Sequence, residues 1–567
     1  MKKIIGERAA ELIICSIAFL FCTLFFCLIT DDYAFFDCGL AAKQFGDFPY
    51  FDWYYLGLIG ISEIYRFAYI HFPAWNWLNI SFVAFELISL YVVLRTIRNV
   101  VLKNVAGVFY VRLVQVLVAI IFIENIVLIS HTRFSLIFCG IGLFNLVFIK
   151  NLTKREFILY SLIFVFGMLI RPESSICMLL LVGVGYLIHQ FEPVVVAKRM
   201  SLCVAATFIL FGIFTIDWYN TDIFVRKIEP EIEYKMMAKR VVDIGQMRNR
   251  ADSAKYEAAL IGMWFDFKTM TPEFMRSLIL PGSDVSLEHI KEVWIHIAGF
   301  YRHYVFLYFT LASFFWLSLL MPNKWVGIKK LILYQLFSVL LVYALDYNGF
   351  LVSNRHFFSI QFISLLVQGF YFFGQHNLTQ RLLVHPVQRA GATIMVLTGI
   401  AITFSNYRNV NSAIDFRTNY MMETMKVFER KYQNRIVVVT NDSRFLFDRH
   451  FSLKNEIYTG NTYLMFDLFT FNLIPRYIQY LGEQCRCDAS DPVAFFNWLS
   501  TKDALYLAAP YRYQTTENYM TAVHGCNISF TSPERINDLA AIPNEDTRES
   551  EIRTIQILPD SVFRKVE

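Results

Sequence analysis

Charged residues are scarce in this chain. Asp, Glu, Lys and Arg make up 17% of its 567 residues, against about 25% in a typical soluble domain, whereas 56% of the residues are hydrophobic. A chain of this length and apolar character is a polytopic membrane protein rather than one large soluble core. Runs of Lys and Arg with interleaved aromatic residues are also lacking, so no nucleic-acid partner is expected.

Cysteine spacings typical of zinc sites are missing as well. The ten cysteines form no CxxC pair, and no His/Cys cluster has ligand spacing, so no zinc site is predicted. Most cysteines lie in or beside apolar segments, where we interpret them as small buried hydrophobic residues. Cys485, Cys487 and Cys526 lie in the polar C-terminal part. If that part is extracytoplasmic, one disulfide using Cys526 leaves one thiol over, and the pairing stays open.

A cleavage site is absent after the apolar N-terminus. The segment MKKIIGERAAELIICSIAFLFCTLFFCLI begins with basic residues, but its apolar part is too long for a signal peptide and no small-x-small site closes it. We therefore predict a retained first transmembrane helix. Internal repeats and low-complexity stretches are also absent, which counts against a transporter built from inverted repeats.

Apolar runs of spanning length recur through the first 405 residues. They predict an α-helical polytopic membrane protein with about eleven transmembrane helices. The short loops on one side carry most of the Lys and Arg, which places that side and the N-terminus in the cytoplasm. The outer short loops hold only Lys43, Arg66, Arg133, Arg171 and Arg355. The predicted spans are roughly 9–29, 77–94, 106–129, 134–149, 157–170, 174–189, 201–217, 303–321, 331–346, 356–373 and 391–405.

Three long polar segments then fall on the outer side. Two are loops of the transmembrane domain 1–405, at roughly 30–76 and 218–302. The second contains EIEYKMMAKRVVDIGQ and PEFMRSLIL, whose apolar spacing predicts short amphipathic helices on the membrane surface. In residues 406–567, RIVVVT and DALYLAAP read as buried strands and VAFFNWLSTK as a helix. This last segment is therefore predicted to be an extracytoplasmic α/β domain.

Two adjacent carboxylates, Asp31 and Asp32, open the first outer loop, and few basic residues follow them there. The plain alternative is an ordinary acidic boundary at a helix end. A carboxylate at the membrane surface can also act as a general base on a sugar or lipid hydroxyl. Two neighbouring carboxylates can hold Mg²⁺ or Mn²⁺, which prefer oxygen ligands, although one acidic pair does not establish a metal site.

Three arginines, Arg133, Arg171 and Arg355, stand at other outer helix ends. Guanidinium groups that share one face can clamp a phosphate, and the alternative for each is an anchor to lipid headgroups. His131 and His356 flank two of them. These histidines are supporting candidates, with a structural hydrogen-bonding role as the alternative.

Two further acids are supporting candidates. Glu173 follows Arg171 and Pro172, and the pair of Pro and Glu is also typical of an ordinary helix start. Asp266 lies among aromatic residues in MWFDFKTMTPEFM. That segment is interpreted either as a lid over an outer cavity or as an interfacial helix with an aromatic belt.

The opening loop resembles that of the GT-C superfamily of membrane glycosyltransferases. It is similar to the D-(D/E)-x-x-(Y/F) start and the G-x-(Y/F) segment of protein O-mannosyltransferases and of the bacterial lipid A aminoarabinose transferase, with Asp31, Asp32, Phe35 and then Gly46 through Tyr50 at the matching positions. The helix count and the outer α/β tail also resemble that layout. The His-Pro-Pro segment of the mannosyltransferase group is missing, so the sugar and the acceptor stay open. Bacterial enzymes that decorate O-antigen with glucose have a comparable layout.

The resemblance implies an inverting transfer of a sugar from a polyprenyl (undecaprenyl) phosphate to a cell-envelope glycan or lipid, on the outer face of the bacterial inner membrane. Asp31 would be the base, Asp32 its neighbour, and the arginines would stabilise the phosphate leaving group. It also implies a functional link to a polyprenyl-phosphate glycosyltransferase and a flippase. The alternatives are an O-antigen polymerase or ligase, against which the long first loop and the α/β tail count, and a transporter or flippase.

Overall fold

The structure is a computed structural model, and it describes most of a helical bundle and a C-terminal sheet. The described residues are 2–25, 29–30, 61–72, 74–104, 108–149, 152–189, 203–205, 209, 266, 269–277, 287–319, 323–347, 354–373, 390–391, 393–394, 397–402, 426–440, 461–466, 483, 486, 488, 491–508, 510–531, 534–535 and 551–557.

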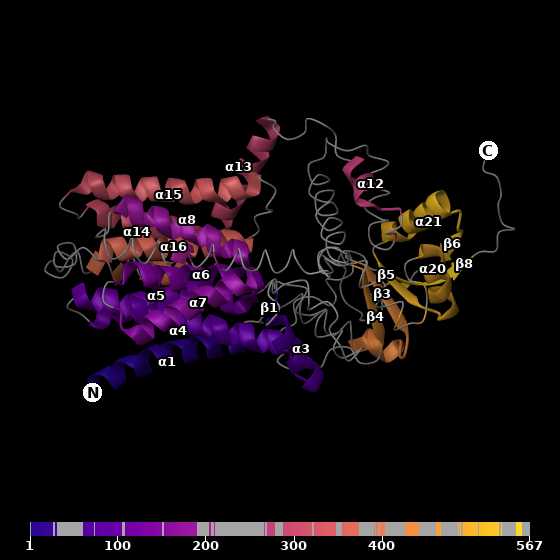
Figure 1. The fold of residues 1–567 in the computed structure, drawn as a ribbon, viewed down its shortest axis with the longest axis horizontal. Helices are drawn as coiled ribbons and strands as arrows, with labels where there is room; N and C mark the ends of the chain where they lie inside the picture. The colour runs from indigo at the N-terminus through magenta and orange to yellow at the C-terminus, as the bar shows by residue number, and fades with distance from the viewer. Residues whose placement is uncertain are drawn as a thin grey trace.

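Long helices lie side by side along the longest axis of the molecule and form a bundle (Figure 1). They follow the apolar runs of the sequence, because a helix satisfies every backbone hydrogen bond internally where no water is available. The helices of this part are α1 (Lys2–Phe25), α3 (Ile61–His71), α4 (Trp77–Asn104), α5 (Val108–Val127), α6 (His131–Phe148), α7 (Lys154–Ile170), α8 (Pro172–His189), α13 (Leu287–His303), α14 (Val305–Leu319), α15 (Lys324–Tyr347) and α16 (Asn354–Phe373). The short α12 (Pro272–Ser277) lies apart from them, toward the C-terminal sheet (Figure 1).

Several of these helices suit a membrane. In the described part of the chain, three are long and apolar enough to cross one: Asn79–Asn99, His131–Phe148 and Lys324–Asp346. The predicted spans at 201–217 and 391–405 are described only in fragments, so a mostly helical membrane protein is confirmed while the count of about eleven spans stays a prediction. Shorter apolar helices are Ala9–Thr23, Val114–Val127, Ser174–His189, Thr310–Leu319 and His356–Phe372.

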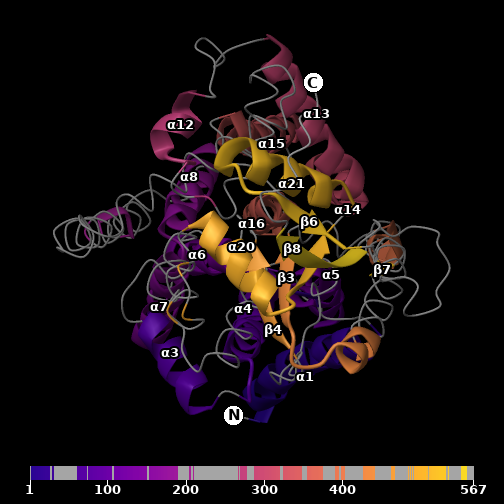
Figure 2. The ribbon, with the colours of Figure 1, turned by 90° about the vertical axis from the view of Figure 1, so that its right-hand side faces the viewer.

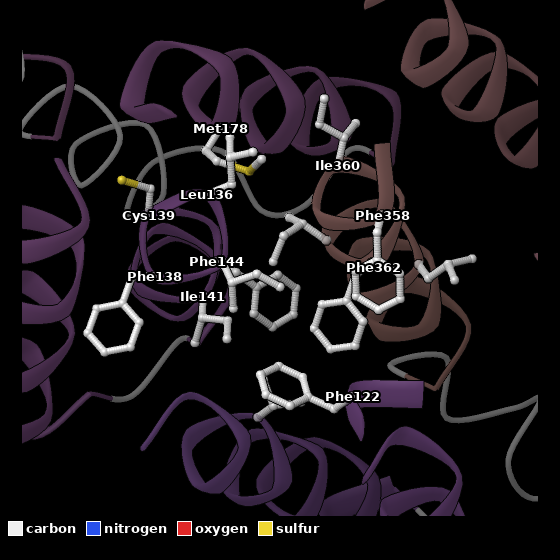
Figure 3. Packing of buried hydrophobic residues seen from close by; sticks show 14 of the residues in the cluster. Phe122, Leu136, Phe138, Cys139, Ile141, Phe144, Met178, Phe358, Ile360 and Phe362 are labelled. Carbon is white, nitrogen blue, oxygen red and sulfur yellow. The ribbon is translucent and has the colours of Figure 1, made fainter. Parts of the chain in front are cut away.

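Helix α6 is the centre of the bundle, and every one of its residues is buried. A helix that is apolar on all sides is covered either by lipid or by other helices, and here other helices cover it. Figure 3 shows α6 side chains such as Phe144 among Met178 of α8, Phe362 of α16 and Phe122 of α5. The rings of Phe122 and Phe362 lie 5.4 Å apart between centroids in an edge-on contact. The apolar core of the bundle is therefore built around α6.

Two glycines let α6 and α7 approach closely. A Cβ added to Gly142 of α6 would lie 2.7 Å from the backbone nitrogen of Phe164 in α7, and one added to Gly167 of α7 would lie 2.8 Å from the backbone nitrogen of Cys139 in α6. Small residues at facing positions are the usual means by which helices pack tightly in membranes.

We expect Gly142→Ala to destabilise the protein by about 1–3 kcal/mol, since the new methyl group overpacks a backbone that cannot give way. The measurement is thermal unfolding in detergent. Gly369→Ala in α16 is the matched control, because its nearest neighbour is 3.6 Å away, and alanine favours a helix over glycine. An unchanged melting temperature in Gly142→Ala would contradict the close packing of α6 on α7.

The C-terminal part is a mixed sheet flanked by two helices, α20 (Pro492–Thr501) and α21 (Pro510–His524). The strand order is β4-β3-β5-β8-β6, with β7 pairing β8 as well; β4, β3 and β5 are parallel and β8 is antiparallel to β5. Figure 2 looks onto this sheet, with the bundle behind it. The strands are β3 (Ile436–Thr440), β4 (Thr462–Phe466), β5 (Leu505–Ala508), β6 (Ile528–Phe530), β7 (Glu534–Arg535) and β8 (Glu551–Ile557).

The local predictions for this part are confirmed. RIVVVT and DALYLAAP supply β3 and β5, and VAFFNWLSTK supplies α20. In the second outer loop PEFMRS forms α12, whereas EIEYKMMAKRVVDIGQ lies outside the described residues. Cys526 is half-buried, while Cys485 and Cys487 lie outside the described part, so the disulfide pairing stays a prediction. The domain boundary at 405 and the extracytoplasmic location stay predictions.

Candidate functional site

A two-residue parallel strand pair connects the end of α1 to the start of α6. In β1 (Ile29–Thr30) and β2 (Leu128–Ile129), Ile29 pairs with Leu128 and Thr30 with Ile129. The pair lies at the end of the bundle that faces the C-terminal sheet (Figure 1). Asp31 and Asp32 follow Thr30 directly in the sequence and lie outside the described residues. The last described residue before the acidic pair is thus bonded to the segment that leads into α6.

Polar side chains gather where α6 begins and α7 ends. Arg171, the C-terminal cap of α7, donates a hydrogen bond from Nη1 to Oγ1 of Thr132 over 2.5 Å. Oγ1 of Thr132 also lies 3.3 Å from Nε2 of His131. The predicted candidates Arg171 and His131 therefore both contact the hydroxyl of Thr132. Helix α8 begins at Pro172, directly after Arg171.

Arg133, also predicted at this end, forms a buried ion pair. Its side chain has no exposed surface, and Nη2 lies 2.8 Å from Oε1 of Glu124. The hydroxyl of Tyr304, between α13 and α14, donates to the same carboxylate oxygen over 2.8 Å. The guanidinium also lies 3.5 Å from Oδ1 of Asn125 and 5.1 Å from the ring centroid of Phe358 in α16. Arg133 thus neutralises an acid, and the pair joins α5, α6, α16 and the junction between α13 and α14.

Removing the acid from this pair is expected to be costly, because it leaves a buried guanidinium uncompensated. Glu124→Gln should lower the free energy of unfolding by about 3–5 kcal/mol, and Tyr304→Phe by about 1.5–3 kcal/mol. Thermal or denaturant unfolding in detergent measures both. The control is Tyr308→Phe, since Tyr308 is 53% exposed. Equal stabilities of Tyr304→Phe and Tyr308→Phe would contradict the network.

Three of the helices that begin at this same end carry the predicted candidates or lie beside them. They are α6, α8 and α16, which begin there along with α4 and α14, and the contact of Arg133 with Phe358 places the N-terminal part of α16 beside α6. Glu173 and Arg355 lie in the first turns of α8 and α16, where only their backbones are described, and His356 is half-buried. Helix N-termini carry partial positive charge and favour anions. The three predicted arginine positions therefore lie at the same end of the bundle, and a shared phosphate site stays a prediction.

Asp266 is placed elsewhere, against α21 of the C-terminal part. Its side chain is fully buried. Oδ2 accepts a hydrogen bond from the Tyr519 hydroxyl over 2.6 Å and lies 2.6 Å from Nε2 of His524. Oδ1 accepts a hydrogen bond from the backbone N–H of Thr269 over 3.1 Å. These contacts anchor the segment that leads into α12 onto α21, more than 250 residues further along the chain.

Burial by itself raises the pKa of Asp266. The hydrogen bonds from Tyr519, Thr269 and His524 outweigh burial, and the pKa lies below the usual carboxyl value. A carboxyl whose pKa is depressed by folding stabilises the folded state above its unfolded pKa of about 3.9. That contribution is lost as the pH falls through the folded-state pKa.

We expect Asp266→Asn to lower the free energy of unfolding by about 1.5–3 kcal/mol at pH 7, since it removes a charged hydrogen-bond acceptor. The difference from wild type should shrink as the pH falls below about 4. The measurement is unfolding as a function of pH. Glu273→Gln on the same segment is the control, since its carboxylate is 72% exposed. A difference that does not vary with pH would contradict the charged anchor.

Metal ligation is tested only in part by the structure. Among the residues it describes, no group of three or more His, Cys, Asp or Glu side chains is placed to hold a metal ion. Asp31 and Asp32, the carboxylates proposed for Mg²⁺ or Mn²⁺, are not among them.

Sequence reasoning missed several residues of this end of the bundle. Tyr304 gives no local signal, because its partner Glu124 lies 180 residues away. Ser130 and Asn125 flank β2 and are buried polar residues beside an apolar run, a pattern that marks functional positions in membrane domains. That pattern was the available signal for both.

Comparisons with known proteins give similarity in structure alone. No family model matches the chain, and no curated protein matches it. It is similar to the crystal structure of ArnT from Cupriavidus metallidurans in the apo state, with a TM-score of 0.39 and 11% sequence identity over 98% of each chain. It is also similar to that of ArnT bound to undecaprenyl phosphate, with a TM-score of 0.35 and 10% identity over 98% of each chain. Likeness at this level carries no argument about activity.

Proposed function

We propose that this protein is a GT-C-type membrane glycosyltransferase that moves a hexose or pentose from a polyprenyl phosphate to a cell-envelope glycan or lipid, on the periplasmic face of the bacterial inner membrane. The parallel pairing of β1 with β2 is the observation that supports this most. Thr30, directly before Asp31, pairs with Ile129, and Arg171 bonds Thr132 three residues further on. A base and a cationic phosphate site then share one end of the bundle.

Asp31 is the proposed base. Its carboxylate takes the proton of the acceptor hydroxyl as the hydroxyl oxygen attacks the anomeric carbon of the sugar. The bond from that carbon to the phosphate oxygen breaks, and its electron pair stays on the phosphate. Attack from the face opposite the leaving group inverts the anomeric centre. Asp32, beside the base, is proposed to orient the acceptor hydroxyl.

The leaving phosphate needs positive charge where its negative charge develops. Arg171 is the proposed direct ligand, together with the N-termini of α6, α8 and α16. Arg355, in the first turn of α16, is the second proposed ligand. Arg133 acts through its pair with Glu124, which fixes the start of α6. His131 acts through Thr132 on Arg171.

The test offers the purified protein undecaprenyl phosphate that carries labelled sugars, one sugar at a time, with envelope lipids or glycans as acceptors. Asp31→Asn should lower the transfer rate by about 10²–10⁴-fold, since it removes the general base, and should leave undecaprenyl phosphate binding intact. Asp52→Asn, in the same loop, is the control. Full-rate transfer by Asp31→Asn would refute the base assignment.

The same assay tests the class of enzyme. If the protein bound no undecaprenyl phosphate and consumed no lipid-linked sugar, the glycosyltransferase proposal would be wrong. A ladder of polymeric products would favour the O-antigen polymerase alternative, whereas a single added sugar is the outcome that we expect.

A further inference from the structure

A group of charged side chains connects α1, α4 and α7 in the half of the bundle that lies away from the C-terminal sheet (Figure 1). Arg95 of α4 pairs with Glu156 of α7 at 2.5 Å, and Arg98 of α4 pairs with Glu11 of α1 at 3.2 Å. Arg95 and Arg98 are three residues apart and therefore lie on one side of α4. Neither ion pair takes part in the proposed transfer reaction, which is placed at the opposite end of the bundle.

The two ion pairs leave hydrogen-bond donors unused. Nε of Arg95 and Nη1 of Arg98 are buried, and neither has a partner among the described residues. The hydroxyl of Tyr160 in α7 is in the same situation, and the side chain of Tyr160 has no exposed surface. A buried donor without an acceptor costs free energy and needs an explanation.

These three donors lie close to one another. Tyr160 follows Glu156 by four residues, so both side chains lie on the same face of α7. Long side chains on a helix lean toward its N-terminus, which brings the Tyr160 hydroxyl toward the pair of Glu156 with Arg95. The hydroxyl lies within electrostatic range of both Arg95 and Arg98. The donors therefore face a common acceptor.

The charge of the group indicates what that acceptor is. Arg112 of α5 also interacts with Glu11, so three arginines stand against the two glutamates of the ion pairs. The group thus carries one net positive charge. A phosphodiester has one negative charge and several acceptor oxygens, and arginine is the side chain that binds phosphate oxygens best.

The group lies where apolar helical segments begin or end. Glu11 stands in the first turn of the apolar segment Ala9–Thr23, and Arg98 is the last residue but one of the span Asn79–Asn99. Basic side chains at the ends of membrane spans are positioned to reach the headgroup layer. The phosphates of membrane lipids are therefore at the same depth as the unused donors.

The surface around the group suits a lipid as well. Leu12 of α1 and Phe157 of α7 each follow a glutamate of the group directly, and both are exposed, as is Leu159. Exposed apolar side chains here can lie against acyl chains. Oε2 of Glu11 is a buried acceptor without a partner in the described part of the chain, and it matches a hydroxyl of a lipid headgroup.

We propose that Arg95, Arg98 and Tyr160 form a binding site for a phosphate oxyanion, and that its source is an anionic phospholipid with a hydroxyl-bearing headgroup in the predicted cytoplasmic leaflet. The side chains of Arg95 and Glu156 are 19% and 17% exposed, so their ion pair separates the buried donors from the headgroup layer. A bound lipid stabilises the junction of α1, α4 and α7. This site does not depend on the proposed transfer activity.

The experiment titrates dioleoylphosphatidylglycerol into the delipidated full-length protein in detergent. Native mass spectrometry measures the dissociation constant of the lipid, and thermal unfolding is recorded with and without it. Dioleoylphosphatidylcholine has the same acyl chains but no net charge. Inorganic phosphate has the charge but no acyl chains. These two ligands are titrated in parallel to separate the lipid source from a free anion.

Two variants with matched controls test the donors. Tyr160→Phe removes the hydroxyl, and Arg95→Lys keeps the charge but removes Nε. Tyr334→Phe is the control for the first, because Tyr334 is equally buried but its hydroxyl donates to the carbonyl of Leu181 over 3.1 Å. Arg155→Lys is the control for the second, since Arg155 is exposed on the same helix as Tyr160.

We expect phosphatidylglycerol to raise the melting temperature of wild type, since a ligand that binds the folded state stabilises it. Tyr160→Phe and Arg95→Lys should each weaken lipid binding about tenfold, because each removes a hydrogen bond to a charged oxygen. Without lipid, Tyr160→Phe should melt no lower than wild type, since its hydroxyl has no partner to lose. Tyr334→Phe should lower the melting temperature without changing lipid affinity, and Arg155→Lys should change neither.

The inference is overturned if wild type does not bind phosphatidylglycerol, or if Tyr160→Phe and Arg95→Lys bind it as tightly as wild type. The buried donors would then be satisfied by water alone. If inorganic phosphate stabilises wild type as well as the lipid does, and Tyr160→Phe abolishes this effect, the oxyanion site stands and its source is free phosphate. Equal affinity for phosphatidylcholine would refute the need for an anionic lipid.

Discussion

The ion pair between Arg133 and Glu124 is the interaction on which the end of the bundle that faces the C-terminal sheet depends. A guanidinium without exposed surface is tolerated in a membrane domain only when a carboxylate neutralises it. Glu124 does so at 2.8 Å, and Tyr304, 180 residues further on, donates to the same oxygen. Because the pair fixes the first turn of α6, it also fixes Thr132 and the arginine that bonds it, Arg171.

Polar contacts set the register in a protein whose stability comes from apolar packing. Glu11, near the middle of α1, pairs with Arg98 of α4 at 3.2 Å, and beyond the C-terminal end of α1 the strand β1 pairs with β2. The helix that precedes the acidic pair is thus tied to its neighbours at two points. Asp266 does the same for the second outer loop, which it ties to α21. Each contact joins segments that the apolar surface alone would leave free to slide.

Local patterns predicted the helices and the strands well, since periodicity and apolar length act over a few residues. They also predicted which helix ends carry arginines. These patterns did not predict which side chains interact. From the sequence, Arg133 could be a lipid anchor, a phosphate ligand or a partner of Glu124. Only the packing of α5 on α6 shows that it pairs with Glu124. The lid interpretation of Asp266 missed Tyr519 for the same reason. Helix α4 also continues past its predicted end at 94 to Asn104, where inner arginines find acids to pair with.

The central claim is that the acidic loop starts beside the N-terminus of α6, and an engineered disulfide tests it most directly. Thr30→Cys and Ile129→Cys are introduced with Cys27 and Cys38 replaced by serine, and cross-linking under mild oxidation is read by mass spectrometry. Paired strand positions have Cα separations that a disulfide can span, so rapid and complete cross-linking is expected. Thr30→Cys with Leu152→Cys is the control pair, since Leu152 lies before the start of α7, and it should stay reduced. The account would be contradicted if the Thr30→Cys and Ile129→Cys pair stayed reduced as well.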